Sequence, residues 1–387
     1  MRQYLIILLL SLLFNFPSQA DHQNESYAFN KMHKYKIDKS ENYHKFDFDL
    51  QDNELSKKVA EQLKNKKKTN LVSYLLYEDG KIIIDQQTKS KYGKYYPSHS
   101  IGKSLVSVVT GYAVCEGYID SVQSNIDYPT VKNTLYENQK LLHLLNMTAG
   151  DELIVGARFY DSDNPIEGKG PNVNTVPIKQ VMKRYFEGTK RYKASGWNTT
   201  TGEVSSSLVY NYSAMTTNVI INYVIYKTGN YWEKLLHKIF TEDAKVKNQV
   251  YFAKTLNKKV GNKKTGEYGR YAFYAQRDDY LRIGLMVMNH WNNDTCVGKY
   301  LKTMFENRVD KNKQSTNTES ASQYSHSYGG QFHFDIVGLE DKKILAMDGF
   351  GGQQLIIDFD KKRIISVAST DRHYDWYEIV YKTLEKD

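Results

Sequence analysis

Apolar and alternating runs near both ends of the chain predict β-strands. Residues 71–77 and 81–85 flank Glu78-Asp79-Gly80, and Asp-Gly between two apolar runs is a strong hairpin signal. Four more strand-like runs lie near the other end, at 328–339, 343–347, 352–358 and 363–369. We therefore expect both ends of the chain to contribute strands to one sheet.

Helical periodicity marks four other segments. Residues 52–67 place Leu55, Val59 and Leu63 at helical spacing with lysines between them, which is typical of a surface helix. The remaining three predicted helices are 100–118, 278–288 and 373–384. The first of these is small and apolar along its whole length, so it predicts a buried helix that ends near Gly117.

These elements predict an α+β fold, with one antiparallel sheet made from both chain ends and flanked by helices. We expect residues 51–119 and 271–387 to form this α/β sheet domain. Residues 120–270 are rich in Asn, Gly and Ser and predict a mainly helical domain with long loops. Residues 21–50 have no clear period and are interpreted as a lead-in segment. A cleft between the two domains is the natural place for a site.

The first twenty residues have the pattern of a secretory signal peptide. Arg2 precedes a short apolar run at 4–16, and Pro17 and the small-x-small pattern at 18–20 follow it. We expect residues 1–20 to be removed after Ala20 and the protein to be secreted or periplasmic. An uncleaved anchor is the alternative, and the shortness of the apolar run argues against it.

The chain carries a net charge of +9, and its lysines cluster at 57–68 and 361–363. A basic patch can bind nucleic acid or an anionic envelope polymer. The first cluster alternates with apolar positions at helical spacing and fits a solvated helix face instead, so we expect no nucleic-acid partner. The sequence does not determine the oligomeric state.

Several classes of cofactor site are excluded by the motifs. Two cysteines cannot form a disulfide-dense scaffold or a four-thiolate zinc site, and the ten histidines are scattered without a metal motif. Gly102-Lys103-Ser104 resembles the end of a phosphate-binding loop, but Pro97 stands where that loop requires glycine. We therefore expect no metal and no cofactor.

The two cysteines lie in different environments. Cys115 falls on the predicted buried helix, where a packed thiol is the favoured interpretation. Cys296 falls in a predicted loop, and a disulfide between the two remains open.

Ser100 and Lys103 form a Ser-x-x-Lys pair at the start of the buried helix. Positions i and i+3 share one face of a helix, so the hydroxyl and the ammonium can meet. Burial lowers the pKa of a lysine and lets it take part in proton transfer. The structural alternative is an N-cap serine followed by a lysine that reaches the solvent.

Further segments match one family in order along the chain. They are Tyr-Glu-Asp-Gly-Lys at 77–81, Ser-His-Ser-Ile-Gly-Lys-Ser at 98–104, Leu-Leu-His-Leu-Leu-Asn-Met-Thr-Ala-Gly at 141–150, Tyr-Ser-Ala at 212–214, Arg-Asp-Asp-Tyr-Leu-Arg-Ile-Gly at 277–284 and Gly-Phe-Gly-Gly-Gln at 349–353. With these segments the chain resembles the serine β-lactamase and penicillin-recognising superfamily, specifically its class C-like branch with the 6-aminohexanoate-dimer hydrolases. The resemblance covers roughly residues 70–370 and implies a β-lactamase-like fold.

The resemblance also implies roles for individual residues. Ser100 would be the acylated nucleophile, Lys103 its proton-transfer partner and Tyr212 the base and acid, with Tyr210 as the nearby competitor. The oxyanion hole would consist of the backbone N–H groups of Ser100 and Phe350. Gly349 and Gly351 would let the two segments approach closely.

Two departures from the family pattern affect the expected substrate. Ala214 stands where the tyrosine motif often has Asn, and Met347-Asp348-Gly349 stands where a Lys-Thr-Gly or His-x-Gly motif is expected. Literal Lys-Thr-Gly strings begin at Lys227 and Lys264, but neither is placed to line a sheet edge beside Ser100. The missing cation argues against recognition of a β-lactam or a peptide carboxylate and favours a neutral or cationic substrate.

Three functions follow as hypotheses. The leading one is a secreted serine hydrolase that cleaves a small-molecule amide or ester through an acyl-enzyme on Ser100. The second is a β-lactamase or a D-alanyl-D-alanine peptidase-like cell-wall enzyme. The third is a non-catalytic envelope-binding module on the same fold, because a fold alone does not establish catalysis.

Overall fold

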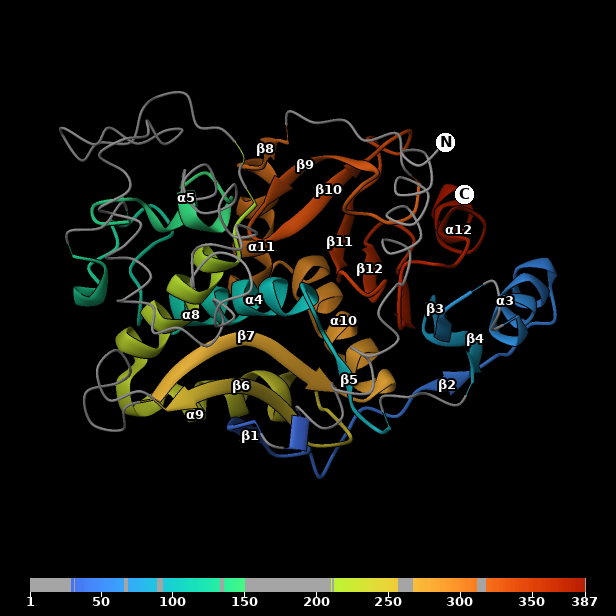
Figure 1. Ribbon diagram of the computed structural model, residues 1–387, viewed down its shortest axis with the longest axis horizontal. Helices are drawn as coiled ribbons and strands as arrows, with labels where there is room; N and C mark the ends of the chain where they lie inside the picture. Colours follow the sequence, from blue (N-terminus) through green and yellow to red (C-terminus); the bar gives the residue numbers. More distant parts are fainter. Residues whose placement is uncertain are drawn as a thin grey trace, which may run out of the picture.

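The computed structural model describes residues 29–30, 32–65, 69–88, 93–132, 136–149, 210, 212–256, 267–311 and 318–386. Within these ranges a layer of helices separates two β-sheets (Figure 1). The predicted signal peptide and residues 151–209, the centre of the expected helical domain, lie outside the described residues. No helix in the described part of the chain has the length and apolar character needed to cross a bilayer.

The larger sheet has nine strands in the order β2-β4-β3-β13-β12-β11-β10-β9-β8. Its strands are β2 (Asp47–Phe48), β3 (Leu71–Glu78), β4 (Lys81–Gln87), β8 (Val309–Asp310), β9 (Ser325–Gly329), β10 (Phe332–Ile336), β11 (Ile344–Asp348), β12 (Gln354–Asp358) and β13 (Arg363–Ser369). Every neighbouring pair is antiparallel except β2 and β4. Because β13 pairs with β3, the two ends of the chain meet in this sheet, which confirms the predicted α+β fold.

Turn residues explain two of the hairpins. Asp79 and Gly80 both have positive φ, at 44° and 96°, as the tight turn between β3 and β4 requires. The run 328–339 was expected as one strand, but it forms parts of β9 and β10. Gly330 and Gln331, with φ of 58° and 68°, turn the chain between them.

The smaller sheet has four antiparallel strands in the order β1-β6-β7-β5. Its strands are β1 (Lys34–Ile37), β5 (Tyr96–Pro97), β6 (Val250–Leu256) and β7 (Glu267–Ala275). Two of them lie where the sequence predicted otherwise, because β1 belongs to the supposed lead-in segment and β6 to the range assigned to helices. β1 has only four residues and pairs with a strand far along the chain, so local periodicity does not reveal it.

Helices cover both faces of the larger sheet. In the described part of the chain, the helices of eight or more residues are α3 (Glu54–Lys64), α4 (Ile101–Cys115), α8 (Ala214–Thr228), α10 (Arg277–Asn292) and α11 (Cys296–Glu306). The shorter ones are α5 (Leu141–Leu145), α9 (Trp232–His237) and α12 (Lys382–Glu385). α3 and the C-terminal segment share one apolar core with this sheet, whereas α4, α8, α10 and α11 share the other. α4 and α8 also pack on β7 of the smaller sheet.

A disulfide joins Cys115 to Cys296, with Cα atoms 5.8 Å apart. Cys115 is the last residue of α4 and Cys296 is the first residue of α11. The favoured interpretation of Cys115 as a packed thiol is therefore wrong, and so is the placement of Cys296 in a loop. The pairing brings together two helix ends from distant parts of the chain, which no local pattern specifies.

Candidate active site

Ser100 lies in a sharp turn between β5 and α4. The preceding residue, His99, has a positive φ of 45°, a strained conformation for a residue with a side chain. Ser98 anchors the turn to β7, because its backbone N–H donates to the Phe273 carbonyl (2.8 Å) and its Oγ accepts from the Phe273 N–H (3.0 Å). The turn thus fixes Ser100 at the start of the buried helix.

Lys103 reaches back to Ser100 along one face of α4. Its Nζ donates a hydrogen bond of 2.8 Å to Ser100 Oγ, as the i, i+3 spacing predicted. Lys103 is only 2% exposed. The alternative in which this lysine reaches the solvent is therefore wrong.

Two tyrosines surround the Lys103 ammonium. Its Nζ lies 4.8 Å from the ring centre of Tyr212 and 4.2 Å from that of Tyr271 on β7. Burial by itself lowers the pKa of Lys103, but interactions with Tyr212 and Tyr271 outweigh burial and raise this pKa above its ordinary value. The expected lowering is wrong, because a local pattern does not reveal which side chains arrive from other elements.

Tyr212 is positioned by the start of α8. Ser213 caps this helix by accepting a hydrogen bond from the Thr216 N–H (3.3 Å), so Tyr212 lies just before the first turn. Tyr210 also borders the cavity, and both rings contact Tyr328, with centres 5.1 Å away for Tyr210 and 6.0 Å for Tyr212. It is the Tyr212 ring that lies 4.8 Å from Lys103 Nζ. The structure therefore brings Tyr212 to Lys103.

The end of β11 approaches the Ser100 turn closely. A Cβ added at Gly349 would lie 2.9 Å from the Ser98 carbonyl oxygen, and one at Gly351 would lie 3.2 Å from His99 Nε2. Within the described residues, the backbone N–H groups of Ser100 and Phe350 donate no hydrogen bond. These two glycines thus let the segment after β11 pass close to the Ser100 turn.

A cavity of about 250 Å³ opens at Ser100. Its lining residues are Ser100, Tyr210, Tyr212, Ser322, His333, Asp348, Phe350 and Arg372. The Phe350 side chain is 77% exposed at this cavity, so it is available to contact a bound molecule.

Arg372 supplies a cation that the sequence analysis did not find. It follows β13, and its Nη2 lies 3.4 Å from Asp348 Oδ1 on β11. Met347 is fully buried in the core, and its neighbour Asp348 borders the cavity. The 347–349 segment carries no cation, as the sequence shows, but Arg372 brings one to the cavity from after β13, where it pairs with Asp348.

Two other basic side chains lie close to this ion pair. Lys311 is buried and donates from Nζ to the Ser322 carbonyl and to Ser325 Oγ, both at 2.8 Å. Burial lowers the pKa of Lys311 to about 8, and Asp348 partly opposes this change. His333 is 5% exposed, and its pKa lies well below the ordinary value because of burial and the charges of Lys311, Arg372 and Lys103.

The sequence missed Tyr271, His333, Lys311 and Arg372. Arg372 could have been found from the sequence, because it directly follows the predicted strand 363–369 and therefore lies at an end of the predicted sheet. The other three carry no motif, because they reach the site only through pairing of distant strands. Of the two Lys-Thr-Gly strings, the one at Lys227 does not line the cavity, and Lys227 pairs with Asp127 at 2.9 Å. The other, at Lys264, lies outside the described residues.

Comparisons with known proteins identify the fold through structure alone. No protein-family model matches the chain, and no curated protein matches it in sequence. A provisionally named 6-aminohexanoate-dimer hydrolase from Bacillus anthracis superposes with a TM-score of 0.63 at 14% identity, over 95% of this chain and 93% of its own.

Two further solved structures are similar. A D-stereospecific amidohydrolase from a Streptomyces species has a TM-score of 0.56 at 12% identity, over 84% of this chain and 97% of its own. A penicillin-binding protein from Bacillus halodurans has a TM-score of 0.55 at 12% identity, over 86% and 99% of the two chains. The chain therefore has the fold of the serine β-lactamases and penicillin-binding proteins, as its ordered motifs indicated.

Proposed function

We propose that the protein is a secreted serine hydrolase that cleaves an amide or ester bond through an acyl-enzyme on Ser100. The observation that carries the proposal is the 2.8 Å contact between Lys103 Nζ and Ser100 Oγ at the edge of a cavity, with Tyr212 beside the same ammonium. A nucleophile within hydrogen-bond reach of a proton-transfer group is the signature of covalent catalysis. The hydrolases among the structural neighbours are consistent with it.

Acylation begins when Ser100 Oγ attacks the substrate carbonyl and gives its proton to Tyr212, the general base of this proposal. Lys103 donates a hydrogen bond to Ser100 Oγ and lies beside the Tyr212 ring, so its ammonium stabilises negative charge on the two oxygens. The N–H groups of Ser100 and Phe350 hold the tetrahedral oxyanion. Tyr212 then returns the proton to the departing amine or alcohol, which leaves an ester on Ser100.

Deacylation reverses these proton movements. A water molecule attacks the Ser100 ester and gives one proton to Tyr212. When the tetrahedral species collapses, Ser100 Oγ leaves and regains that proton, and the carboxylic acid product departs. In both halves of the reaction the protons move between the substrate or water, Ser100 and Tyr212.

The first experiment compares the wild type, Ser100→Ala and Ser107→Ala with p-nitrophenyl acetate, by colour release and intact mass. Ser107 lies on the same helix but bonds to Tyr300 and does not border the cavity, so it is a matched control. We expect turnover or an acetyl adduct in the wild type and Ser107→Ala only. Equal background activity in all three proteins would leave the non-catalytic binding module as the better hypothesis.

Secretion is part of the same proposal. The Cys115–Cys296 disulfide supports it, because disulfides persist in oxidising compartments. The full chain, expressed in a bacterium and recovered from the periplasm or medium, is expected to begin at Asp21. Recovery of a chain that still begins at Met1 would contradict cleavage after Ala20.

A second candidate function is favoured by Arg372. A β-lactamase or a D-alanyl-D-alanine peptidase-like enzyme needs a cation for the substrate carboxylate, and Arg372 provides one at the cavity. The test is acylation by benzylpenicillin, followed by mass, in the wild type and Arg372→Gln. A Ser100-linked adduct that forms at least about tenfold more slowly in Arg372→Gln would support this candidate, since one charge-assisted contact contributes roughly 1.5–3 kcal/mol. The absence of any adduct in a wild type that cleaves esters would reject it.

A further inference from the structure

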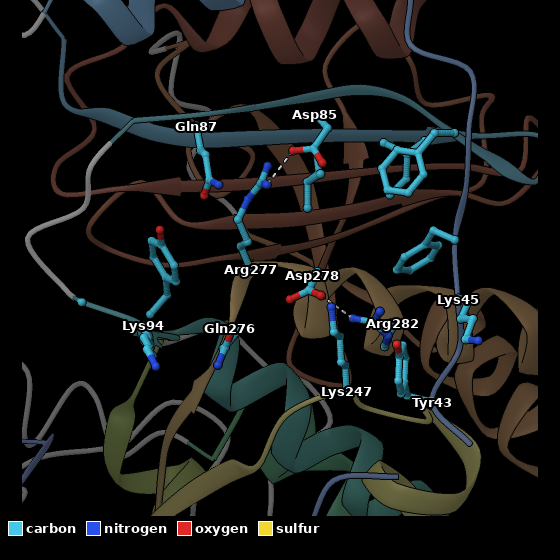
Figure 2. A pocket seen from close by; sticks show the side chains of 16 residues that line it. Tyr43, Lys45, Asp85, Gln87, Lys94, Lys247, Gln276, Arg277, Asp278 and Arg282 are labelled. Carbon is cyan, nitrogen blue, oxygen red and sulfur yellow. Dashed lines mark hydrogen bonds and ion pairs between the residues drawn. The ribbon is translucent and has the colours of Figure 1, made fainter. Parts of the chain in front are cut away.

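A second cavity, of about 520 Å³, lies apart from the one at Ser100 and shares no lining residue with it. Its walls come from the segment around β2, from β3 and β4, and from the beginning of α10 (Figure 2). Five basic and two acidic side chains line it. The basic ones are Lys45, Lys94, Lys247, Arg277 and Arg282, and the acidic ones are Asp85 and Asp278.

Arg277 is fully engaged within the protein. Its Nη1 donates to Asp85 Oδ1 at 2.6 Å, and its Nε donates to Ser73 Oγ at 2.6 Å. Its Nη2 donates to the carbonyls of Tyr74 and Gln86 at 3.4 and 3.3 Å. Figure 2 shows the guanidinium directed at Asp85 across the cavity wall.

Arg282 is engaged in the same way. Its Nε donates to the His44 carbonyl at 2.9 Å, and its Nη1 lies 2.8 Å from Asp278 Oδ2 and 3.2 Å from Asp279 Oδ1. The two arginines therefore hold the walls together, and the two acidic lining residues are neutralised by them. The remaining charge of the cavity comes from its lysines.

The three lysines are exposed and form no ion pair with any described residue. Lys94 lies toward one end of the view in Figure 2, Lys45 toward the other, and Lys247 between them. Lys247 Nζ lies 5.6 Å from the ring centre of Tyr43, which also borders the cavity. The structure thus presents three ammonium groups along one cavity, none of them in an ion pair with a described residue.

From this arrangement we infer that the cavity binds a linear chain of phosphate groups, which the three ammonium groups contact at separate points along its length. An ammonium is a point charge that suits phosphate, whereas the guanidinium groups of Arg277 and Arg282 already bind carboxylates of the protein itself. Because Lys94 and Lys45 lie toward opposite ends of the cavity in Figure 2, the arrangement favours an extended anion over a single phosphate. The site does not use Ser100 and is independent of the proposed hydrolase activity.

The test is a titration of fluorescently labelled inorganic polyphosphate with the disulfide-bonded protein, followed by anisotropy at about 0.15 M salt. The cavity variant is Lys45→Gln/Lys94→Gln/Lys247→Gln. The matched control is Lys64→Gln/Lys132→Gln/Lys299→Gln, which removes the same charge from exposed lysines that do not line the cavity. We expect the cavity variant to bind at least about tenfold more weakly than the wild type, and the control to stay within about threefold.

Further binding measurements distinguish a site for extended polyphosphate from a phosphate site, from general charge attraction and from a nucleic-acid site. Ser100→Ala is expected to bind as the wild type does, whether or not the protein proves to be a hydrolase. Orthophosphate is expected to compete only at a concentration far above that of polyphosphate, and competition at equal phosphate concentration would overturn the extended site. Equal losses in the two triple variants would show general attraction to a basic protein and would also overturn it. Equally tight binding of oligothymidylate through the same three lysines would assign the cavity to nucleic acid instead.

Discussion

At the Ser100 turn, one buried ammonium contacts the nucleophile and two phenol side chains. Tyr212 and Tyr271 both lie beside Lys103, so the arrangement contains two phenols that compete for the role of general base. Only Tyr212 borders the cavity together with Ser100. The base in the proposed mechanism is therefore Tyr212, while Tyr271 supports the charge of Lys103 from β7.

Tyr212→Phe and Tyr271→Phe form a matched pair that tests this assignment. We expect Tyr212→Phe to lower the rate of Ser100 acylation by roughly 10²–10⁴-fold, as loss of a general base does. Tyr271→Phe should lower it by less than about tenfold, since Lys103 keeps its bond to Ser100. Stopped-flow acylation by an activated ester measures both rates, and similar losses in the two variants would contradict the assignment.

Lys311 gives the site a predictable pH dependence of stability. Its pKa is about 8 in the folded protein, below its ordinary value of 10.5. Between these values the unfolded chain binds more protons, so the Lys311 contribution to the free energy of unfolding rises with pH, by up to about 3 kcal/mol. Below about pH 8 both states carry the proton, and the penalty of the buried ammonium is constant.

The measurement is urea unfolding of the wild type and Lys311→Met at pH 7.5 and 9.5. The difference in unfolding free energy between the two proteins is expected to shift in favour of the wild type at the higher pH. Tyrosine ionisation affects both proteins alike and cancels in the difference. A difference that does not change between the two pH values would show that Lys311 keeps an ordinary pKa.

Residue spacing alone identified only a pair whose relation is local, whereas Tyr212 and Phe350 were named through the family resemblance. Ser100 and Lys103 are three positions apart on a helix, so spacing alone predicts their contact. Arg372 and His333 reach the same cavity from separate strands, and no spacing in the chain encodes that meeting. The pKa direction of Lys103 failed for the same reason, because Tyr271 arrives from β7.

At the scale of elements, α4 must lie close to β7 for the site to form. Gly102 marks this contact, because a Cβ there would lie 2.0 Å from the Tyr271 carbonyl oxygen and 2.7 Å from Ser98 Oγ. The first of these atoms belongs to the backbone and cannot rotate away. The helix and the strand would have to separate to make room.

We therefore expect Gly102→Ala to destabilise the protein by about 1–3 kcal/mol, the usual range for overpacking. It should also slow acylation, because it moves the helix turn that carries Ser100 and Lys103. The wild type is the reference for both readouts. Thermal unfolding and ester turnover measure them, and a variant as stable and active as the wild type would mean that α4 lies farther from β7.

The elements themselves were largely predictable. The helices around 54–64, 101–115 and 277–292 and the strands of the hairpin at Gly80 follow from periodicity and turn residues. The smaller sheet did not follow, because β1 and β5 are short and owe their conformation to pairing with β6 and β7.

At the scale of the whole molecule, the Cys115–Cys296 disulfide closes a loop of about 180 residues. Such a cross-link restricts the unfolded chain, and its removal typically costs about 2–4 kcal/mol. Cys115→Ala/Cys296→Ala is thus expected to lower the urea midpoint to the value of the reduced wild type. Dithiothreitol should shift only the wild type, and an equal shift of the variant would point to a cause other than this bond.

The position of β13 has a consequence for how the chain is made. This strand lies inside the larger sheet between β3 and β12, although β3 begins at Leu71 and β13 ends at Ser369. While the ribosome is still translating the middle of the chain, β3 has a hairpin partner on one side and none on the other. The sheet closes only after β13 has emerged, so one edge of β3 stays unpaired and open to other strands while the intervening residues are made.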